Sequence, residues 1–363
     1  GDPYVPDIAA KLGVTDRHLR RIFREAHGVT PVDYLSTQRL LLAKQLLTDT
    51  DMPVTQVALA SGHASLRRFN AAFAQRYRMN PSALRKQAPP EAARDTVPSL
   101  RLAYRPPYDI DGVMGFLARR AMPGVEVVDG LELRRTLRWV HQGRQLQGWL
   151  QGCFVPQRNE LRLSLSPSLL PAAGALMLRL RHALDLDADP SLIDLCLAAM
   201  PHPPRAGLRV PGALDGFETA VRIILGQQVT VAAARTLAQR LVAEFGSPID
   251  TPFAGLDTLF PGAADIATAD PARIGRLGIV RQRVGALQAL AREVADGRIE
   301  LHPAAPLTAT LDALRALPGI GEWTVQLIAM RVLAWPDAFA ATDIGVLNAL
   351  GTRDLARVQA QAE

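Results

Sequence analysis

Lysine and cysteine, two residue types that carry much protein chemistry, are scarce in this sequence. The only lysines are Lys11, Lys44 and Lys86, so no later residue can supply an amine for a Schiff base. Two cysteines, Cys153 and Cys196, are too few for a four-cysteine zinc site or for an iron–sulfur cluster held by cysteines alone. One disulfide between them is conceivable, but we expect two buried thiols. We predict no metal bound by side chains.

Long apolar runs and glycine-rich phosphate loops are also missing. No stretch reaches the roughly 20 apolar residues that cross a bilayer, and no basic segment followed by an apolar one opens the chain. We therefore expect a cytoplasmic protein without a membrane partner. The absence of a phosphate loop and of alternating strands and helices argues against a doubly wound nucleotide-binding fold.

Positive charge is concentrated at the start of the chain. Residues 1–90 hold 13 basic and 7 acidic residues, which accounts for the whole net charge of +6, because the remainder holds 28 of each sign. A compact basic segment is the electrostatic footprint expected of a DNA-binding module. A solvated charged face is the alternative.

The 363 residues are too many for one ordinary hydrophobic core. The pattern of apolar residues along the chain predicts a multidomain protein, mainly α with one α+β domain. Residues 1–88 have helical periodicity, and the Pro- and Ala-rich stretch 89–98 resembles a linker. Short alternating runs over 99–204 predict an antiparallel sheet with helices near 112–122 and 171–184. Residues 205–363 again appear helical.

Two segments of the basic region, 5–28 and 53–81, share one pattern. Each has a short helix, a turn at glycine, and a second helix with the motif L-R-R-[IF], at 19–22 and 66–69, after the N-cap candidates Thr15 and Ser65. With a connecting helix over 33–47, the two units can enter successive major grooves, unless they form a plain helical bundle with exposed arginines. The predicted DNA contacts are Arg17, His18, Arg20, Arg21, Ser65, Leu66, Arg67 and Arg68.

Residues 1–86, and above all the ending RYRMNPSALR, resemble AraC-type regulators, in particular the regulator of the adaptive response to alkylation. The resemblance implies sequence-specific operator binding, with RNA polymerase as a further candidate partner. In that family a methyl-acceptor domain with bound zinc precedes this module, and one more helix precedes residue 5; neither is present in these 363 residues.

The sharpest motif is LRALPGIGEWTVQLIAMRVL, residues 314–333. It predicts a helix ending near Leu317, a tight turn, and a helix starting at Glu322. Glycines suit a backbone that turns through conformations costly for other residues, and outward amides at a helix start can bind a DNA phosphate. An ordinary turn between helices is the alternative. The predicted phosphate-binding residues are Pro318, Gly319, Ile320, Gly321 and Thr324, with their carbonyls a candidate site for a monovalent cation.

Asp343 follows this turn by about 22 residues and opens a helix after a loop of small residues. Taken alone it could be a simple N-cap. Together with the preceding turn, it has the arrangement of a helix-hairpin-helix glycosylase, in which the carboxylate is catalytic. It can serve both purposes.

Residues 99–363 resemble the bacterial DNA-3-methyladenine glycosylase II family, through YRPPYDIDGVMGFLARRAMPGVE (104–126) and RVPGALDGFETAVRIILGQQVTVAAA (209–234). The resemblance implies hydrolysis of the N-glycosidic bond of an alkylated base flipped out of duplex DNA. Asp343 would stabilise a cationic sugar and orient water. The missing lysines exclude the lyase chemistry of related enzymes, and no cofactor is implied.

The same resemblance assigns a base pocket and a wedge. Trp323, whose indole face attracts a cationic base, and Phe116 are pocket candidates, although such residues are often simply core. Leu327 stands where the family has a pocket tyrosine. Gln227 and Gln228 are the flipping residues, and Gln228 replaces a bulky apolar wedge. The family continues through a final helix with a tryptophan that closes the base pocket, and this helix is missing from the 363 residues.

Three functions remain open from the sequence. The first is a glycosylase for 3-methyladenine or 7-methylguanine, fused to an operator-binding domain. The second is a transcription factor whose glycosylase-like domain senses a lesion or ligand without catalysis. The third is excision of a different base, such as a deaminated purine.

Overall fold

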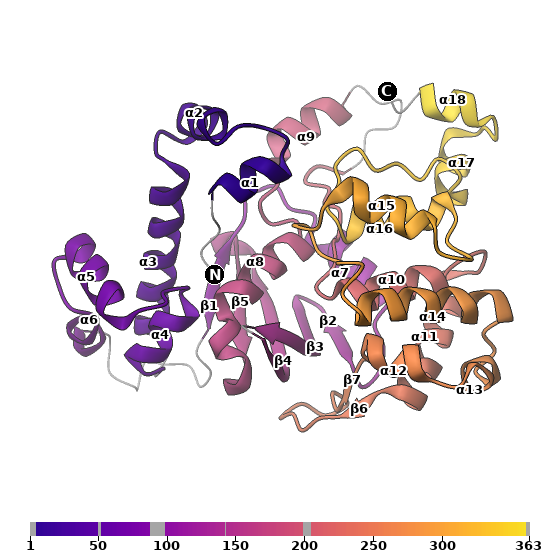
Figure 1. Ribbon diagram of the computed structural model, residues 1–363, viewed down its shortest axis with the longest axis horizontal. Coiled ribbons are helices and arrows are strands. Elements are labelled where there is room, and N and C mark those ends of the chain that lie inside the picture. The colour runs from indigo at the N-terminus through magenta and orange to yellow at the C-terminus, as the bar shows by residue number, and fades with distance from the viewer. Residues whose placement is uncertain (1–4, 50–51, 88–98, 142, 199–204, 361–363) are drawn as a thin grey trace. The chain divides into compact units, whose positions relative to one another are not determined.

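The structure is a computed structural model (Figure 1), and it describes residues 5–49, 52–87, 99–141, 143–198 and 205–360. The chain divides into two compact units, each assembled from separate stretches: 1–102, 139–152 and 162–178 in one, and 103–138, 153–161 and 179–363 in the other. The expected linker at 89–98 lies outside the described residues. None of the described helices is long and apolar enough to span a bilayer.

The N-terminal region contains two helix-turn-helix units. They are α1 (Val5–Lys11) with α2 (Asp16–His27), and α4 (Val54–Ala60) with α5 (Leu66–Tyr77); α3 (Pro31–Asp49) joins them and α6 (Pro81–Gln87) follows. As predicted, Thr15 caps α2 by accepting from the amide of His18, and Ser65 caps α5 by accepting from that of Arg68.

The shared L-R-R-[IF] letters do not occupy equivalent positions in the two units. Counted from the N-caps, Leu19 corresponds to Phe69, and both are buried, whereas Leu66 and Ile22 are exposed. The two motifs are therefore offset by almost one helical turn. The two units are aligned by the buried residue that follows each N-cap by four positions, and not by the L-R-R-[IF] motif. This alignment makes Arg17 the counterpart of Arg67.

One five-stranded sheet follows, in the order β1-β5-β4-β3-β2. Its strands are β1 (Leu100–Ala103), β2 (Glu126–Asp129), β3 (Glu132–His141), β4 (Arg144–Val155) and β5 (Glu160–Leu165). β2 and β3 pair antiparallel, with Glu126 opposite Arg135. The alternating runs predicted four of these strands. β2 was missed because its sequence, EVVD, does not alternate between apolar and polar residues as that of β1, LRLA, does.

Short helices accompany the sheet. They are α7 (Ile110–Ala118), η2 (Pro156–Arg158), η3 (Pro167–Ala172), α8 (Ala173–Ala183) and α9 (Pro190–Leu197). Both cysteines are free, and Cys196 is exposed on α9. The expectation that both thiols are buried was therefore wrong, because Cys153 is half-buried and Cys196 lies in an exposed stretch of α9 with Leu192 and Leu195.

The remaining helices follow in the chain, and the first seven of them supply side chains to one hydrophobic core. They are α10 (Gly216–Leu225), α11 (Val231–Phe245), α12 (Ala263–Thr268), α13 (Pro271–Arg276), α14 (Arg281–Ala295), α15 (Leu307–Arg315), α16 (Glu322–Arg331), α17 (Ile344–Leu350) and α18 (Leu355–Ala360). A two-stranded sheet, β6 (Ser247–Pro248) and β7 (Thr258–Leu259), lies in the chain between α11 and α12.

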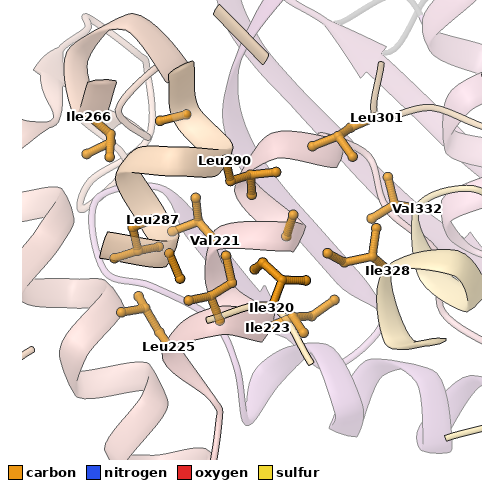
Figure 2. Close-up of a cluster of buried hydrophobic side chains, with 14 of the residues drawn as sticks. Val221, Ile223, Leu225, Ile266, Leu287, Leu290, Leu301, Ile320, Ile328 and Val332 are labelled. Atoms are coloured by element: carbon orange, nitrogen blue, oxygen red, sulfur yellow. The ribbon is translucent and has the colours of Figure 1, made fainter. Parts of the chain in front are cut away.

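The core side chains come from every helix from α10 to α16 and from the connecting loops. Figure 2 shows part of this core, including Ile320 from the turn before α16. Ile320 is only 7% exposed, so the turn is anchored by an apolar side chain while its glycines stay at the surface of the core. This anchoring fixes the turn against the helices that carry the candidate site.

Candidate DNA-repair site and DNA interface

The predicted turn is a tight connection between two helices. Gly319 has φ +78°, in the left-handed region, and a Cβ built there would lie 3.0 Å from the Cβ of Ala286 on α14. Gly321 is the N-cap of α16, with no side-chain cap. Its neighbouring amides therefore begin the helix without a side-chain acceptor, which suits a phosphate oxygen.

Gln227 ties this turn to the loop that follows α10. Its side-chain amide donates to the carbonyl of Gly319 at 3.0 Å and to Oγ1 of Thr324 at 2.9 Å. The main-chain carbonyl of Gln227 accepts a hydrogen bond from the guanidinium of Arg283 on α14. Thr324 is almost fully buried, so its hydroxyl serves this contact, and a phosphate would meet backbone amides instead.

Gln228 differs from the neighbouring Gln227 in its exposure and its backbone conformation. It has φ +53° and an exposed side chain, in a loop held by the three hydrogen bonds of Gln227. A non-glycine residue in the left-handed region is uncommon and is found where the surroundings impose it. Of the two glutamines predicted as flipping residues, the side chain of Gln227 is committed to the hairpin and that of Gln228 is projected outward.

Asp343 is the N-cap of α17, as the sequence predicted. Its Oδ1 accepts from the amide of Gly345 at 2.8 Å, and its Oδ2 accepts from the indole Nε1–H of Trp323 at 2.8 Å. Each carboxylate oxygen keeps acceptor capacity beyond this one bond. The carboxylate is thus oriented by two donors from different helices and remains half-buried rather than enclosed.

The contact between Trp323 and Asp343 was not foreseen. The sequence suggested Trp323 as a stacking face, whereas the structure also uses the edge of its indole to hold the carboxylate. Leu327 lies one turn further along α16, partly buried against the core. Trp323, Leu327 and Arg331 are spaced at four-residue intervals along α16. This spacing indicates from the sequence that the three side chains share one face of the helix.

Phe116 on α7 lies among arginines. The guanidinium carbon of Arg120 is 3.8 Å from its ring centroid, and that of Arg331 is 5.1 Å away. Neither arginine was singled out from the sequence, although Arg120 follows Phe116 by one helical turn. Because cations already occupy positions around the ring, Phe116 is a poor partner for a further cationic group.

An ion pair joins the two helices that flank the turn. Arg315 of α15 donates to both carboxylate oxygens of Glu322, at 3.0 and 3.1 Å, and Gln326 donates to Oε1 at 2.7 Å. These hydrogen bonds, chiefly that from Arg315, hold the pKa of Glu322 below its usual value. Among the described residues, no cluster of His, Cys, Asp or Glu is arranged to bind a metal ion.

On the N-terminal units the predicted contact arginines are exposed but differ in their partners. Arg20 pairs with Asp16 at 2.9 Å and Arg21 with Glu25 at 2.9 Å, both within α2. Within the described ranges, Arg67 and Arg68 at the start of α5 form no ion pair. Exposed pairs are weak, so DNA phosphates can displace them.

An α+β domain, a helix-hairpin-helix with its N-cap carboxylate, and tandem helix-turn-helix units define a base excision DNA repair protein joined to a DNA-binding module. Three family models match in this order: "Helix-turn-helix domain" over residues 8–87, "AlkA N-terminal domain" over 99–215, and "HhH-GPD superfamily base excision DNA repair protein" over 221–361. The domain order agrees with the fold expected from the sequence.

The chain belongs to the family of bifunctional transcriptional activator/DNA repair enzymes AlkA. It is 36% identical to the probable member from Mycobacterium tuberculosis, over 94% of this chain and 69% of that protein. It is 32% identical to DNA-3-methyladenine glycosylase 2 of Escherichia coli, over 67% of this chain and 83% of that enzyme. The fold resembles that of the 3-methyladenine DNA glycosylase from Archaeoglobus fulgidus, with a TM-score of 0.60, 19% identity, and coverage of 72% of this chain and 91% of that one.

Proposed function

We propose that the chain hydrolyses the N-glycosidic bond of alkylated bases in duplex DNA, with Asp343 as the catalytic carboxylate. The observation that carries this proposal is the double fixation of Asp343 by Trp323 and Gly345, at a helix start that follows the hairpin. An alkylated purine is already cationic and leaves readily, so the enzyme has to stabilise the sugar cation that remains.

The carboxylate acts on both charge and water. Its unused lone pairs can face the flipped sugar, where its negative charge stabilises the developing oxocarbenium ion. The same group can then orient a water molecule and accept its proton as the new C–O bond forms. With no lysine after Lys86, the reaction ends at the abasic sugar without strand cleavage.

The loop after α10 supplies the means of flipping. Gln228, exposed and held in a left-handed conformation, enters the space that the extruded nucleotide leaves. As a polar wedge it can hydrogen-bond to the orphaned base, where an apolar wedge would only stack. The backbone amides around Gly319 and Gly321 seat a phosphate of the same strand region.

The N-terminal module reads an operator sequence. Arg67 and Arg68 lie in the first turn of α5, and Arg17 and His18 are their counterparts in α2. Side chains at such helix starts reach guanine edges or phosphates. We propose that this module recruits the chain to promoters and that RNA polymerase is the partner there. The protein would act in the cytoplasm, where that DNA lies.

The decisive assay measures free base released from duplexes that contain 3-methyladenine or 7-methylguanine. Asp343→Asn preserves an N-cap and should lower base release by a factor of at least about 100, as expected for loss of a charged group that acts only in the transition state. A thermal unfolding midpoint equal to that of the parent controls for folding.

The alternatives give different results in the same assay. Selective binding of damaged duplex without base release by the parent would support the non-catalytic sensor. Release from hypoxanthine-containing duplex in preference to the alkylated ones would point to deaminated purines. Undiminished release by Asp343→Asn would refute the assignment of the carboxylate.

A further inference from the structure

A small cavity behind Phe116 is lined by an unusual number of charged side chains. It has a volume of about 70 Å³ and lies between α7, the β2–β3 pair, α10 and α16. The charged residues in its wall are Arg120, Glu126, Arg135, Glu218, Arg222 and Arg331. None of them has a part in the catalytic step proposed above.

Two of the four arginines are neutralised by the two carboxylates. Arg135 donates to Glu126 at 2.8 Å and to Glu218, and Arg222 donates to Glu218 at 2.9 Å and to Glu126 at 3.2 Å. Burial acts to raise the pKa of Glu126, but Arg222 and Arg135 outweigh it and hold that pKa below its usual value. At Glu218 burial outweighs the arginines and raises the pKa. The four groups form one hydrogen-bonded network, and Asp215 also acts on Arg135 from outside it.

Arg120 and Arg331 are left outside this network. Arg120 donates to the carbonyl of Phe116 at 3.2 Å, and Arg331 to the carbonyl of Pro211 at 3.1 Å. In the part of the chain that is described, neither forms a salt bridge. Burial, together with Arg222 and Arg120, lowers the pKa of Arg331 to about 10.

The wall therefore carries four positive and two negative charges, an excess of two positive charges beside a cavity. Uncompensated charge away from water is costly, and a bound anion would offset that cost. Guanidinium groups present a planar fork of donors that matches an oxyanion with two hydrogen bonds. On the measure by which one water needs about 10–15 Å³, the cavity has space for several waters and therefore for a small tetrahedral oxyanion.

We propose that this cavity binds a small inorganic oxyanion of the phosphate class, held by Arg120 and Arg331. The bound ion joins the residue that follows the C-cap of α7 to the last residue of α16, the helix that also carries Trp323. It therefore stabilises the unit that contains Asp343 without entering the reaction. A phosphate of the DNA backbone is the other source of the same chemistry, and the experiment below distinguishes the two sources.

The test measures binding of inorganic phosphate to the full chain by calorimetry, and thermal unfolding with phosphate or chloride at equal ionic strength. The parent should bind phosphate saturably, and its unfolding midpoint should rise with phosphate concentration as linkage requires. Arg331→Met should weaken phosphate binding at least about tenfold, through loss of charge-assisted hydrogen bonds. Without phosphate it should unfold no lower than the parent, because an uncompensated charge is gone.

The matched control is Arg298→Met, which removes an exposed arginine paired with Glu293 at 2.7 Å; its phosphate binding should equal the parent's. Arg120→Met serves as the second variant if Arg331→Met does not fold. Unchanged phosphate binding in Arg120→Met, no saturable binding by the parent, or equal stabilisation by chloride would each overturn the proposal. Loss of affinity for an undamaged duplex in Arg331→Met, with phosphate binding intact, would assign the arginine to the DNA backbone instead.

Discussion

The geometry at Asp343 depends on one side-chain hydrogen bond from a distant part of the chain. Trp323 donates its indole N–H to Oδ2 at 2.8 Å, and Gly345 donates its amide to Oδ1 at the same distance. A carboxylate with both oxygens engaged cannot rotate freely, so its remaining lone pairs keep a fixed direction. Trp323 therefore positions the carboxylate that we propose to be catalytic, independently of any contact of its indole face with the base.

Trp323→Phe tests this positioning role. The substitution keeps an aromatic face but removes the donor, and a hydrogen bond to a charged group contributes about 1.5 kcal/mol. We expect kcat for base release to fall about tenfold while KM changes little. Trp335→Phe is the control, since Trp335 packs against the same core. An equal loss of kcat in both variants would show that the effect comes from altered core packing and not from the lost hydrogen bond.

At the scale of elements, the hairpin is held by an apolar anchor and by polar contacts from two other segments. Ile320 inserts into the core, Gln227 bonds to Gly319 and Thr324, and Arg315 bridges to Glu322. The conformation of the turn also depends on glycine. Gly319 is left-handed and close to Ala286, whereas Gly321 has φ −91° and open space around its Cβ position.

Gly319→Ala should therefore destabilise the protein by about 1–2 kcal/mol, the usual cost of a left-handed conformation for a residue with a Cβ. Displacement of the turn should also weaken binding to undamaged duplex of any sequence. Urea unfolding and fluorescence anisotropy measure the two effects. Gly321→Ala is the control for stability and should unfold within about 0.5 kcal/mol of the parent. Similar losses in both variants would contradict the special role of Gly319.

At the scale of the whole molecule, two DNA-binding functions are carried by separate parts of one chain. The helix-turn-helix match covers 8–87 and the glycosylase matches cover 99–361 apart from a short gap. The formal excess of charge lies entirely in the first 90 residues. Operator binding should therefore be the more sensitive to salt of the two functions.

We expect the two functions to be separable by single substitutions. Arg67→Ala should weaken binding to a duplex selected from random sequences by about tenfold, because one base-edge or phosphate contact contributes ~1–3 kcal/mol. Its base release should be unchanged, while Asp343→Asn should show the reverse pattern. Anisotropy with the selected duplex and the base-release assay give the two readouts. A variant that impairs both equally would indicate that the two parts act as one binding surface.

Much of this organisation could be predicted from local patterns. The N-caps Thr15 and Ser65, the start of α16 at Glu322 and the cap Asp343 all follow from capping residues ahead of periodic helices. The offset between the two L-R-R-[IF] motifs was not predictable in this way. It depends on which apolar residue each small core buries, and identical letters can serve either position.

The sequence by itself determined the order of the domains, the hairpin and its glycines, the carboxylate after it, and the exclusion of lysine chemistry. These features are local, because they depend on neighbours within a few residues or on composition. Only the tertiary structure decided that Trp323 holds Asp343, that Gln227 serves the hairpin while Gln228 is projected, and that Phe116 lies among arginines. Apart from the contact between Phe116 and Arg120, those contacts join residues from 20 to 215 positions apart, and only packing sets such pairings.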